Sequence, residues 1–141
     1  MRKISLFIAT SLDGYIAKPN DDLREIGPSH YDNGQRDVYV ITRTERPQAG
    51  RTIFHTGNIS ELVKRLKSEK GKNIYCDGGA EVIDELLKQD LIDEFIISVI
   101  PVLLGDGTRL FKDGRPEQIL ELISVKAFET GLTQLHYKKK K

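Results

Sequence analysis

The stretch that most constrains the fold is residues 72–111, which reads as strand, glycine pair, helix, strand and glycine-bearing loop. Residues 73–76 are short and mostly apolar, which is typical of a buried parallel strand. Residues 80–89 carry their apolar side chains at helical spacing. Residues 95–100 are apolar on both faces, which predicts a second strand inside the sheet. A strand, a helix and a strand within about 30 residues form a βαβ unit, which is almost always right-handed.

Gly78 and Gly79 lie where the first of these strands meets the helix. Without Cβ atoms the backbone there can approach a ligand closely, and the first amides of a helix have no intrahelical acceptor. Those amides and the helix dipole favour an anion such as a pyrophosphate. The alternative is a tight turn without a ligand, because a Gly-Gly pair is less specific than the G-x-G-x-x-G motif, which is absent here.

A second glycine pair, Gly105 and Gly107 around Asp106, follows the next strand. Open α/β sheets bind ligands at the carboxyl ends of their strands. Two glycine loops at neighbouring strand ends therefore indicate a nucleotide-binding cleft.

The amino-terminal part of the chain predicts a central strand at residues 3–9 and a loop at residues 10–17, at the carboxyl end of that strand. Asp13 and Gly14 lie in this loop. The pair is common in tight turns, and the spacing alone leaves two roles open for Asp13, turn former or ligand contact.

The remaining elements follow from the same patterns. Residues 38–42 and 52–55 are predicted strands, and residues 58–70 form an amphipathic helix. Residues 119–128 and 132–138 flank Gly131 at hairpin spacing, which predicts an antiparallel addition at the edge of a mainly parallel sheet.

Length and composition set the broad class. A chain of 141 residues predicts a single domain, residues 1–141, with a substantial core. The net charge is +1, yet the chain ends in four lysines, so the rest is net negative and argues against a nucleic-acid surface. One cysteine, no signal-like segment and no membrane-length apolar run predict a cytoplasmic protein. The three histidines lack metal-ligand spacing, so no metal site is expected.

Three ordered motifs resemble one family. Residues 76–111 are similar to the cofactor half of the dihydrofolate-reductase-like fold, and they resemble most the C-terminal reductase domain of the bacterial bifunctional riboflavin-biosynthesis deaminase/reductase (RibD). Residues 11–17, SLDGYIA, resemble the S-L-D-G-x-I-A signature of that branch, and Ile41-Thr42-Arg43 resembles its strand-ending T-R. The resemblance implies a dihydrofolate-reductase-like, three-layer α/β domain with a mostly parallel central sheet and a C-terminal antiparallel hairpin.

The resemblance also implies a function. It points to an NADPH-dependent oxidoreductase that transfers a hydride to a pteridine-like or ribosylaminopyrimidine-like substrate, and to a homodimer. Asp13 becomes the candidate catalytic residue, as a substrate-contacting or proton-handling carboxylate. Arg43 suits a phosphate at the adenosine end of NADPH. The candidate cofactor-binding residues are Ala9, Thr10, Thr42, Arg43, Gly78, Gly79, Ala80, Glu81, Gly105, Asp106 and Gly107.

Residues 18–37 depart from the family pattern. They are polar and show no clear periodicity, where relatives have a helix, a strand ending in a G-R-x-T-like phosphate-binding turn, and another helix. Either the chain is a shortened relative or a segment is missing from the sequence. A second hypothesis therefore stays open, namely a shortened, non-catalytic nucleotide-binding or scaffold homologue.

Overall fold

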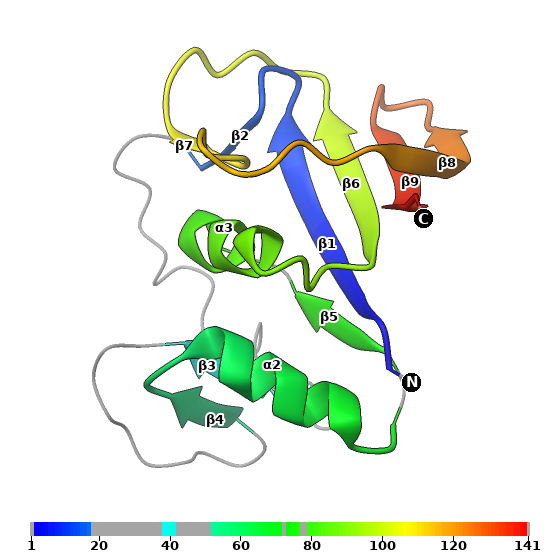
Figure 1. Cartoon of the computed structure of the whole chain (residues 1–141). Coiled ribbons are helices and arrows are strands. Elements are labelled where there is room, and N and C mark those ends of the chain that lie inside the picture. Colours follow the sequence, from blue (N-terminus) through cyan, green and yellow to red (C-terminus); the bar gives the residue numbers. More distant parts are fainter. Residues whose placement is uncertain (1, 18–37, 42–51, 72, 77–78, 141) are drawn as a thin grey trace. The chain divides into compact units, whose positions relative to one another are not determined.

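The computed structural model describes residues 2–17, 38–41, 52–71, 73–76 and 79–140 (Figure 1). The chain divides into two compact units. The smaller, Asp21–Ile59, contains β3 (Val38–Ile41) and β4 (Thr52–His55), which pair in parallel. The larger, Met1–Asn20 with Ser60–Lys141, contains the main sheet and the amino end of the chain.

The sheet of the larger unit has five strands in the order β5-β1-β6-β9-β8. β1 (Ile4–Ser11) lies between β5 (Ile74–Cys76) and β6 (Glu94–Ile100) and is parallel to both. β9 (Thr133–Lys139) is antiparallel to β6 and to β8 (Leu120–Ala127). The predicted mostly parallel sheet with a C-terminal antiparallel hairpin is thereby confirmed.

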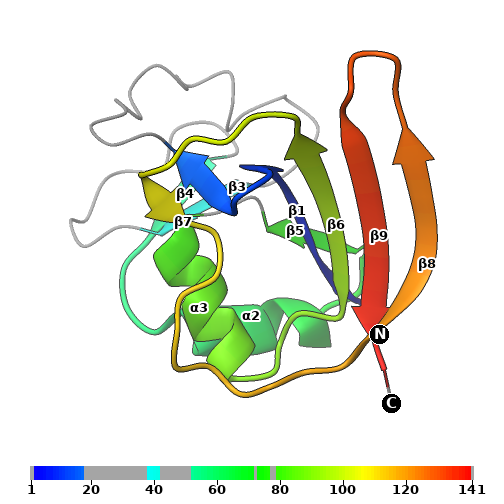
Figure 2. The same ribbon diagram turned by 90° about the horizontal axis from the view of Figure 1, so that it is seen from above.

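Two amphipathic helices supply the other half of the core. α2 (Ile59–Ser68) and α3 (Ala80–Lys88) match the predicted helices, and in Figure 2 both lie on one side of the sheet. Within the described residues, neither helix is long and apolar enough to cross a membrane. Together with side chains of β1 and β6 they supply most of the buried apolar residues, and the main core residues are Ile4, Leu6, Leu62, Val63, Leu66, Ile83, Leu86, Leu87 and Phe95.

Two local predictions are wrong. Residues 73–76 were expected to form a buried strand, but β5 ends the sheet in the described part of the chain and Tyr75 is 54% exposed. Thr10 and Ser11 were expected in a loop, but they continue β1, because they pair with Val99 and Ile100 of β6 and are buried.

The expected loop after β1 contains another short strand. β2 (Tyr15–Ala17) pairs antiparallel with β7 (Thr108–Arg109), which lies within the second glycine loop region. This ribbon joins the amino-terminal motif to a segment more than 90 residues later in the chain, and the sequence pattern did not predict it.

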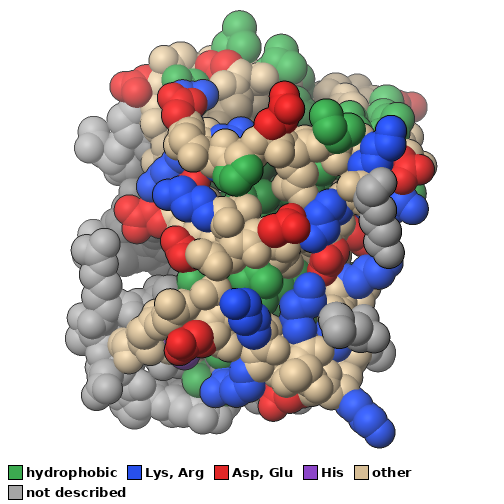
Figure 3. Space-filling view, in the orientation of Figure 1, with side chains coloured by type: hydrophobic (Ala, Val, Ile, Leu, Met, Phe, Trp, Pro, Cys, Tyr) green, Lys and Arg blue, Asp and Glu red, His purple; other side chains and the backbone are tan. Residues whose placement is uncertain are grey.

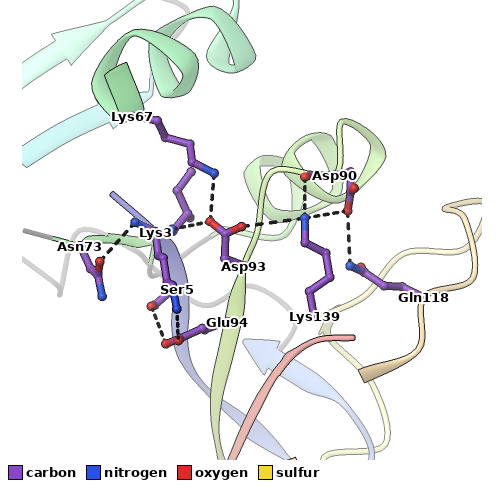
Figure 4. A network of polar contacts seen from close by, with 10 residues as sticks. Lys3, Ser5, Lys67, Asn73, Asp90, Asp93, Glu94, Gln118 and Lys139 are labelled. Atoms are coloured by element: carbon purple, nitrogen blue, oxygen red, sulfur yellow. Dashed lines mark hydrogen bonds and ion pairs between the residues drawn. The ribbon is translucent and has the colours of Figure 1, made fainter. Parts of the chain in front are cut away.

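Asp93, just before β6, connects elements that are distant in the sequence (Figure 4). Its Oδ2 accepts hydrogen bonds from the backbone amide of Ile4 and from Nζ of Lys67, both at 2.9 Å. Nζ of Lys139 lies 3.8 Å from Oδ1. One partly buried carboxylate therefore joins β1, α2 and β9 where β1 begins.

Asp93→Asn should destabilise the protein. The substitution keeps the shape of the side chain but removes the charge that faces Lys67, whose side chain is only 18% exposed. We expect the free energy of unfolding to fall by about 1–3 kcal/mol, because a partly buried ammonium loses its charged acceptor. Urea unfolding followed by circular dichroism measures this change.

Glu121→Gln is the matched control. The pair of Glu121 and Lys138 is 3.7 Å apart, with both side chains about half exposed. Its loss should change stability by no more than about 0.5 kcal/mol, since exposed ion pairs contribute little. Equal losses in the two variants would contradict the connecting role of Asp93.

Candidate functional site

The candidate site lies at the carboxyl ends of the parallel strands of the larger unit. β1 and β6 end together, with Ser11 opposite Ile100, and their arrowheads lie side by side at the top of Figure 1. β5 points in the same direction but ends earlier, with Cys76 opposite Leu6. The two strands followed by glycine loops, β5 and β6, do not pair with each other but flank β1.

Asp13 in that loop binds the second glycine loop. Its Oδ1 accepts hydrogen bonds from the Ser11 hydroxyl at 2.5 Å and from the Leu104 amide at 3.1 Å. Its Oδ2 accepts one from the Gly105 amide at 2.8 Å. The side chain thus contacts two successive amides 91 and 92 residues away.

These donors also determine the charge of the side chain. The hydrogen bond from Ser11, followed by that from the Gly105 amide, lowers the pKa of Asp13 below its ordinary value. Asp13 is therefore ionised at neutral pH. Its predicted roles as a substrate contact or proton handler stay predictions.

The candidates on β1 differ in what their side chains can offer. Thr10 is buried, and its hydroxyl donates to the carbonyl of Tyr15 at 3.3 Å, so this side chain joins β1 to β2. Ala9 is exposed and lies opposite Ser98 of β6 in the sheet. Their assignment to the cofactor stays a prediction.

The amino end of α3 offers an open backbone surface. Its N-cap is Gly79, and among the described residues no side chain makes a cap hydrogen bond at this end. A Cβ atom added at Gly79 would meet no heavy atom within 4 Å. The Ala80 side chain is buried, so only its backbone can face a ligand. The first turn of a helix and open space beside it suit an anionic group.

An ion pair links this helix end to the second glycine loop region. Nζ of Lys112 lies 3.8 Å from Oε1 of Glu81 in the first turn of α3. Glu81 is a candidate residue whose charge would repel a phosphate, and Lys112 offsets that charge. Lys112 therefore brings a positive charge to the end of α3.

The second glycine loop has a backbone that requires glycine. Gly105 and Gly107 have φ values of +77° and +137°, a region that residues with a Cβ atom rarely occupy. The amide of Gly107 donates to Oδ1 of Asp106 at 2.8 Å, which forms a local turn. Cofactor binding by these three candidates stays a prediction.

The same end of the unit carries exposed apolar side chains. In Figure 3 hydrophobic groups gather at the top, over the loops that follow β1 and β6. Leu12 is 67% exposed and Leu103 is 69% exposed, and the amide of Leu12 donates to the carbonyl of Val102 at 2.9 Å. This apolar surface lies beside Asp13.

Three of the predicted cofactor-binding residues lie outside the described residues, namely Thr42, Arg43 and Gly78. Sequence reasoning also missed three residues of the site. Ser11 and Lys112 bind candidates directly, and Leu104 supplies an amide to Asp13. Only Ser11 had a visible signal, since it begins the SLDGYIA motif two residues before Asp13.

The fold and motifs define a dihydrofolate-reductase-like α/β protein. More closely, the chain belongs to the RibD C-terminal domain family, whose model matches residues 31–134. It is 36% identical to YwjB, an uncharacterized protein of Bacillus subtilis, over 170 aligned positions that cover 96% of this chain and 97% of YwjB. The alignment is longer than this 141-residue chain, which therefore has gaps relative to YwjB, and gaps fit both a shortened relative and a sequence that lacks a segment.

Two solved structures show the same fold. A candidate riboflavin biosynthesis protein from Shewanella sp. PV-4 has a TM-score of 0.78 and 27% identity, with 99% of each chain covered. Dihydrofolate reductase from Enterococcus faecalis, complexed with NADP(H), has a TM-score of 0.66 and 15% identity, with 99% of this chain and 97% of that chain covered. At that identity the second likeness concerns the fold alone.

Gly79→Ala should leave the folded protein intact. The backbone of Gly79, at φ −83° and ψ −163°, is extended and open to any residue. We expect the free energy of unfolding to stay unchanged or to rise by up to about 1 kcal/mol, because alanine restricts the unfolded chain. Thermal and urea unfolding measure it.

Gly131→Ala is the contrasting variant. Gly131 has φ +93°, and a Cβ atom there would lie 3.1 Å from Cγ of Pro101. This variant should lose about 1–3 kcal/mol, because alanine is strained in that conformation. A comparable loss in Gly79→Ala would show that the space at the end of α3 is not open.

Proposed function

We propose that this protein is an NADPH-dependent oxidoreductase that transfers a hydride to a small heterocyclic substrate. The observation that supports this most is the amino end of α3, which follows β5 and has a glycine N-cap with open space beside it. The family of the chain and its fold support the same reaction class.

NADPH fits this end of the unit through its pyrophosphate. The first amides of α3 and the helix dipole would bind the anion, and the missing side chain of Gly79 leaves room for it. Arg43 is proposed to bind the 2′-phosphate, on the sequence motif alone. Bound NADPH supplies the hydride, while residues of the chain bind the cofactor and orient the substrate.

The substrate class follows from the surface beside Asp13. Exposed Leu12 and Leu103 suit the face of a flat ring, and an ionised carboxylate favours a partner that carries N–H donors. A pteridine or a ribosylaminopyrimidine combines both properties. We therefore propose a riboflavin-biosynthesis-type or dihydrofolate-reductase-like substrate.

The second candidate is a shortened, non-catalytic nucleotide-binding or scaffold protein. The gaps relative to YwjB are consistent with it. The family resemblance implies a G-R-x-T-like phosphate-binding turn in the region of residues 18–37, and that motif is absent from this sequence. Cofactor binding and turnover separate the two functions. A scaffold should bind NADPH negligibly, and a mere binder should transfer no hydride.

Titration with NADPH, followed by nucleotide fluorescence, tests the proposal, with NADH as the comparison. We expect NADPH to bind more tightly than NADH. Gly79→Ala should weaken NADPH binding by about tenfold or more, because its Cβ atom occupies the space for the pyrophosphate, and tenfold equals about 1.4 kcal/mol. Arg43→Ala should remove the preference for NADPH over NADH.

Glu121→Gln serves as the binding control and should leave the affinity unchanged, because Glu121 lies on β8, at the opposite end of the strand order from β5, which precedes α3. Absence of binding by either nucleotide at millimolar concentration would contradict the reductase and favour the scaffold. A homodimer and a cytoplasmic location stay predictions from the family resemblance and the composition.

A further inference from the structure

We propose that Asp13 is a positioning residue, whose carboxylate orders the second glycine loop by binding the successive amides of Leu104 and Gly105. The proposal deepens the proposed function, since it rests on that loop being part of the cofactor or substrate site. It assigns Asp13 an action through the loop backbone rather than proton transfer to the substrate.

The first argument is geometric. Both carboxylate oxygens are engaged, Oδ1 by Ser11 and Leu104 and Oδ2 by Gly105, at 2.5, 3.1 and 2.8 Å. Ser11 is itself fixed, because it is buried at the end of β1 and its hydroxyl accepts the Tyr15 amide at 2.9 Å. Ser11 of β1 therefore fixes the Asp13 side chain, and Asp13 in turn binds the second glycine loop.

The second argument concerns the hydrogen bonds that connect the second glycine loop to the rest of the larger unit. Before residues 103–107, the carbonyl of Val102 accepts the amide of Leu12 at 2.9 Å. After residues 103–107, the amide of Leu110 donates to the carbonyl of Gly14 at 2.8 Å, and β7 pairs with β2. Between these ties, the hydrogen bonds found in the described part of the chain that reach outside residues 103–107 are those to Asp13.

The third argument is chemical. Two successive amides that converge on one anion form a nest, and backbone nests bind anions. Here the anion is part of the protein, so this nest is already occupied. Three donors stabilise the charged carboxylate and lower the pKa of Asp13, which makes it a poor proton donor at neutral pH.

The hydrogen bonds of Asp13 also indicate different binding roles for the two glycine segments. A cofactor phosphate would meet a filled nest and a negative charge at Leu104 and Gly105, but open amides at Gly79. We infer that the second glycine loop is shaped to face a ring or a hydrogen-bond donor, and that phosphate binding belongs to α3.

Nuclear magnetic resonance of the cofactor-free protein tests the proposal. In the wild type, the amide protons of Leu104 and Gly105 should titrate together, with one midpoint below the ordinary carboxyl pKa of 3.8. The sign follows from the lowered pKa. The hydrogen bonds from the two amides to the ionised carboxylate are present at higher pH and are lost as the pH falls through the pKa of Asp13 in the folded protein. Core amides such as that of Leu91 should not follow this titration.

Two variants extend the test. In Asp13→Asn the amide nitrogen cannot accept, so the shared titration should disappear and the heteronuclear NOE of Leu104 and Gly105 should fall. Ser11→Ala should move the shared midpoint upward, because the Ser11 hydroxyl is the largest cause of the lowered pKa. Ser11→Ala keeps the proposal testable if Asp13→Asn fails to fold.

Asp113→Asn is the matched control. It removes one negative charge from the same connection between β6 and β8, but Asp113 is 89% exposed and pairs with Arg109. It should leave the amide signals of Leu104 and Gly105 unchanged. Independent titration of these two amides in the wild type, or unchanged loop order in Asp13→Asn, would overturn the proposal.

Kinetics separate this proposal from the proposed function. The resonance experiment needs no cofactor. Absence of NADPH binding would therefore contradict the proposed reductase function without contradicting the positioning role of Asp13. Where turnover is measured, Asp13→Asn should raise KM by about tenfold or more and lower kcat less, because a displaced loop weakens binding. A fall in kcat alone, with loop order unchanged, would instead assign Asp13 to proton transfer.

Discussion

The position of β1 between two parallel strands is the constraint on which the rest of the larger unit depends. Because β1 and β6 are parallel and end together, at Ser11 opposite Ile100, the segments that follow them emerge at one edge. Burial of Ile4 and Leu6 in the core holds β1 in place. The hydrogen bond from the Ile4 amide to Asp93 fixes the residue at which β1 begins. The register then determines that Asp13 emerges beside the loop after β6.

Much of this architecture could be predicted from the sequence, because local patterns encode it. The helical spacing of Ile83, Leu86 and Leu87 predicted α3, and the apolar run from Phe95 predicted an interior strand. The turn at Gly131 predicted the C-terminal hairpin, and its φ of +93° explains the need for glycine. Each of these signals lies within about a dozen residues, where periodicity and turn preferences act.

The polar contacts of the site could not be predicted in the same way. Asp13 and Leu104 are 91 residues apart, and a backbone amide leaves no mark in the sequence because every residue except proline has one. Asp93 likewise looked like one acidic residue among several near the end of α3, but its partners come from β1, α2 and β9. Such contacts depend on strand order and register, which local patterns do not specify.

The site uses one kind of chemistry, backbone amides that bind an anion, in two different states. At Leu104 and Gly105 the carboxylate of Asp13 already occupies the amides, while at the end of α3 no cap hydrogen bond from a described side chain is found. An internal anion costs no translational entropy when the protein folds, so it orders a loop permanently. In the proposed function, the exchangeable anion of the cofactor therefore binds at the amino end of α3, and the loop after β6 is ordered before the cofactor arrives.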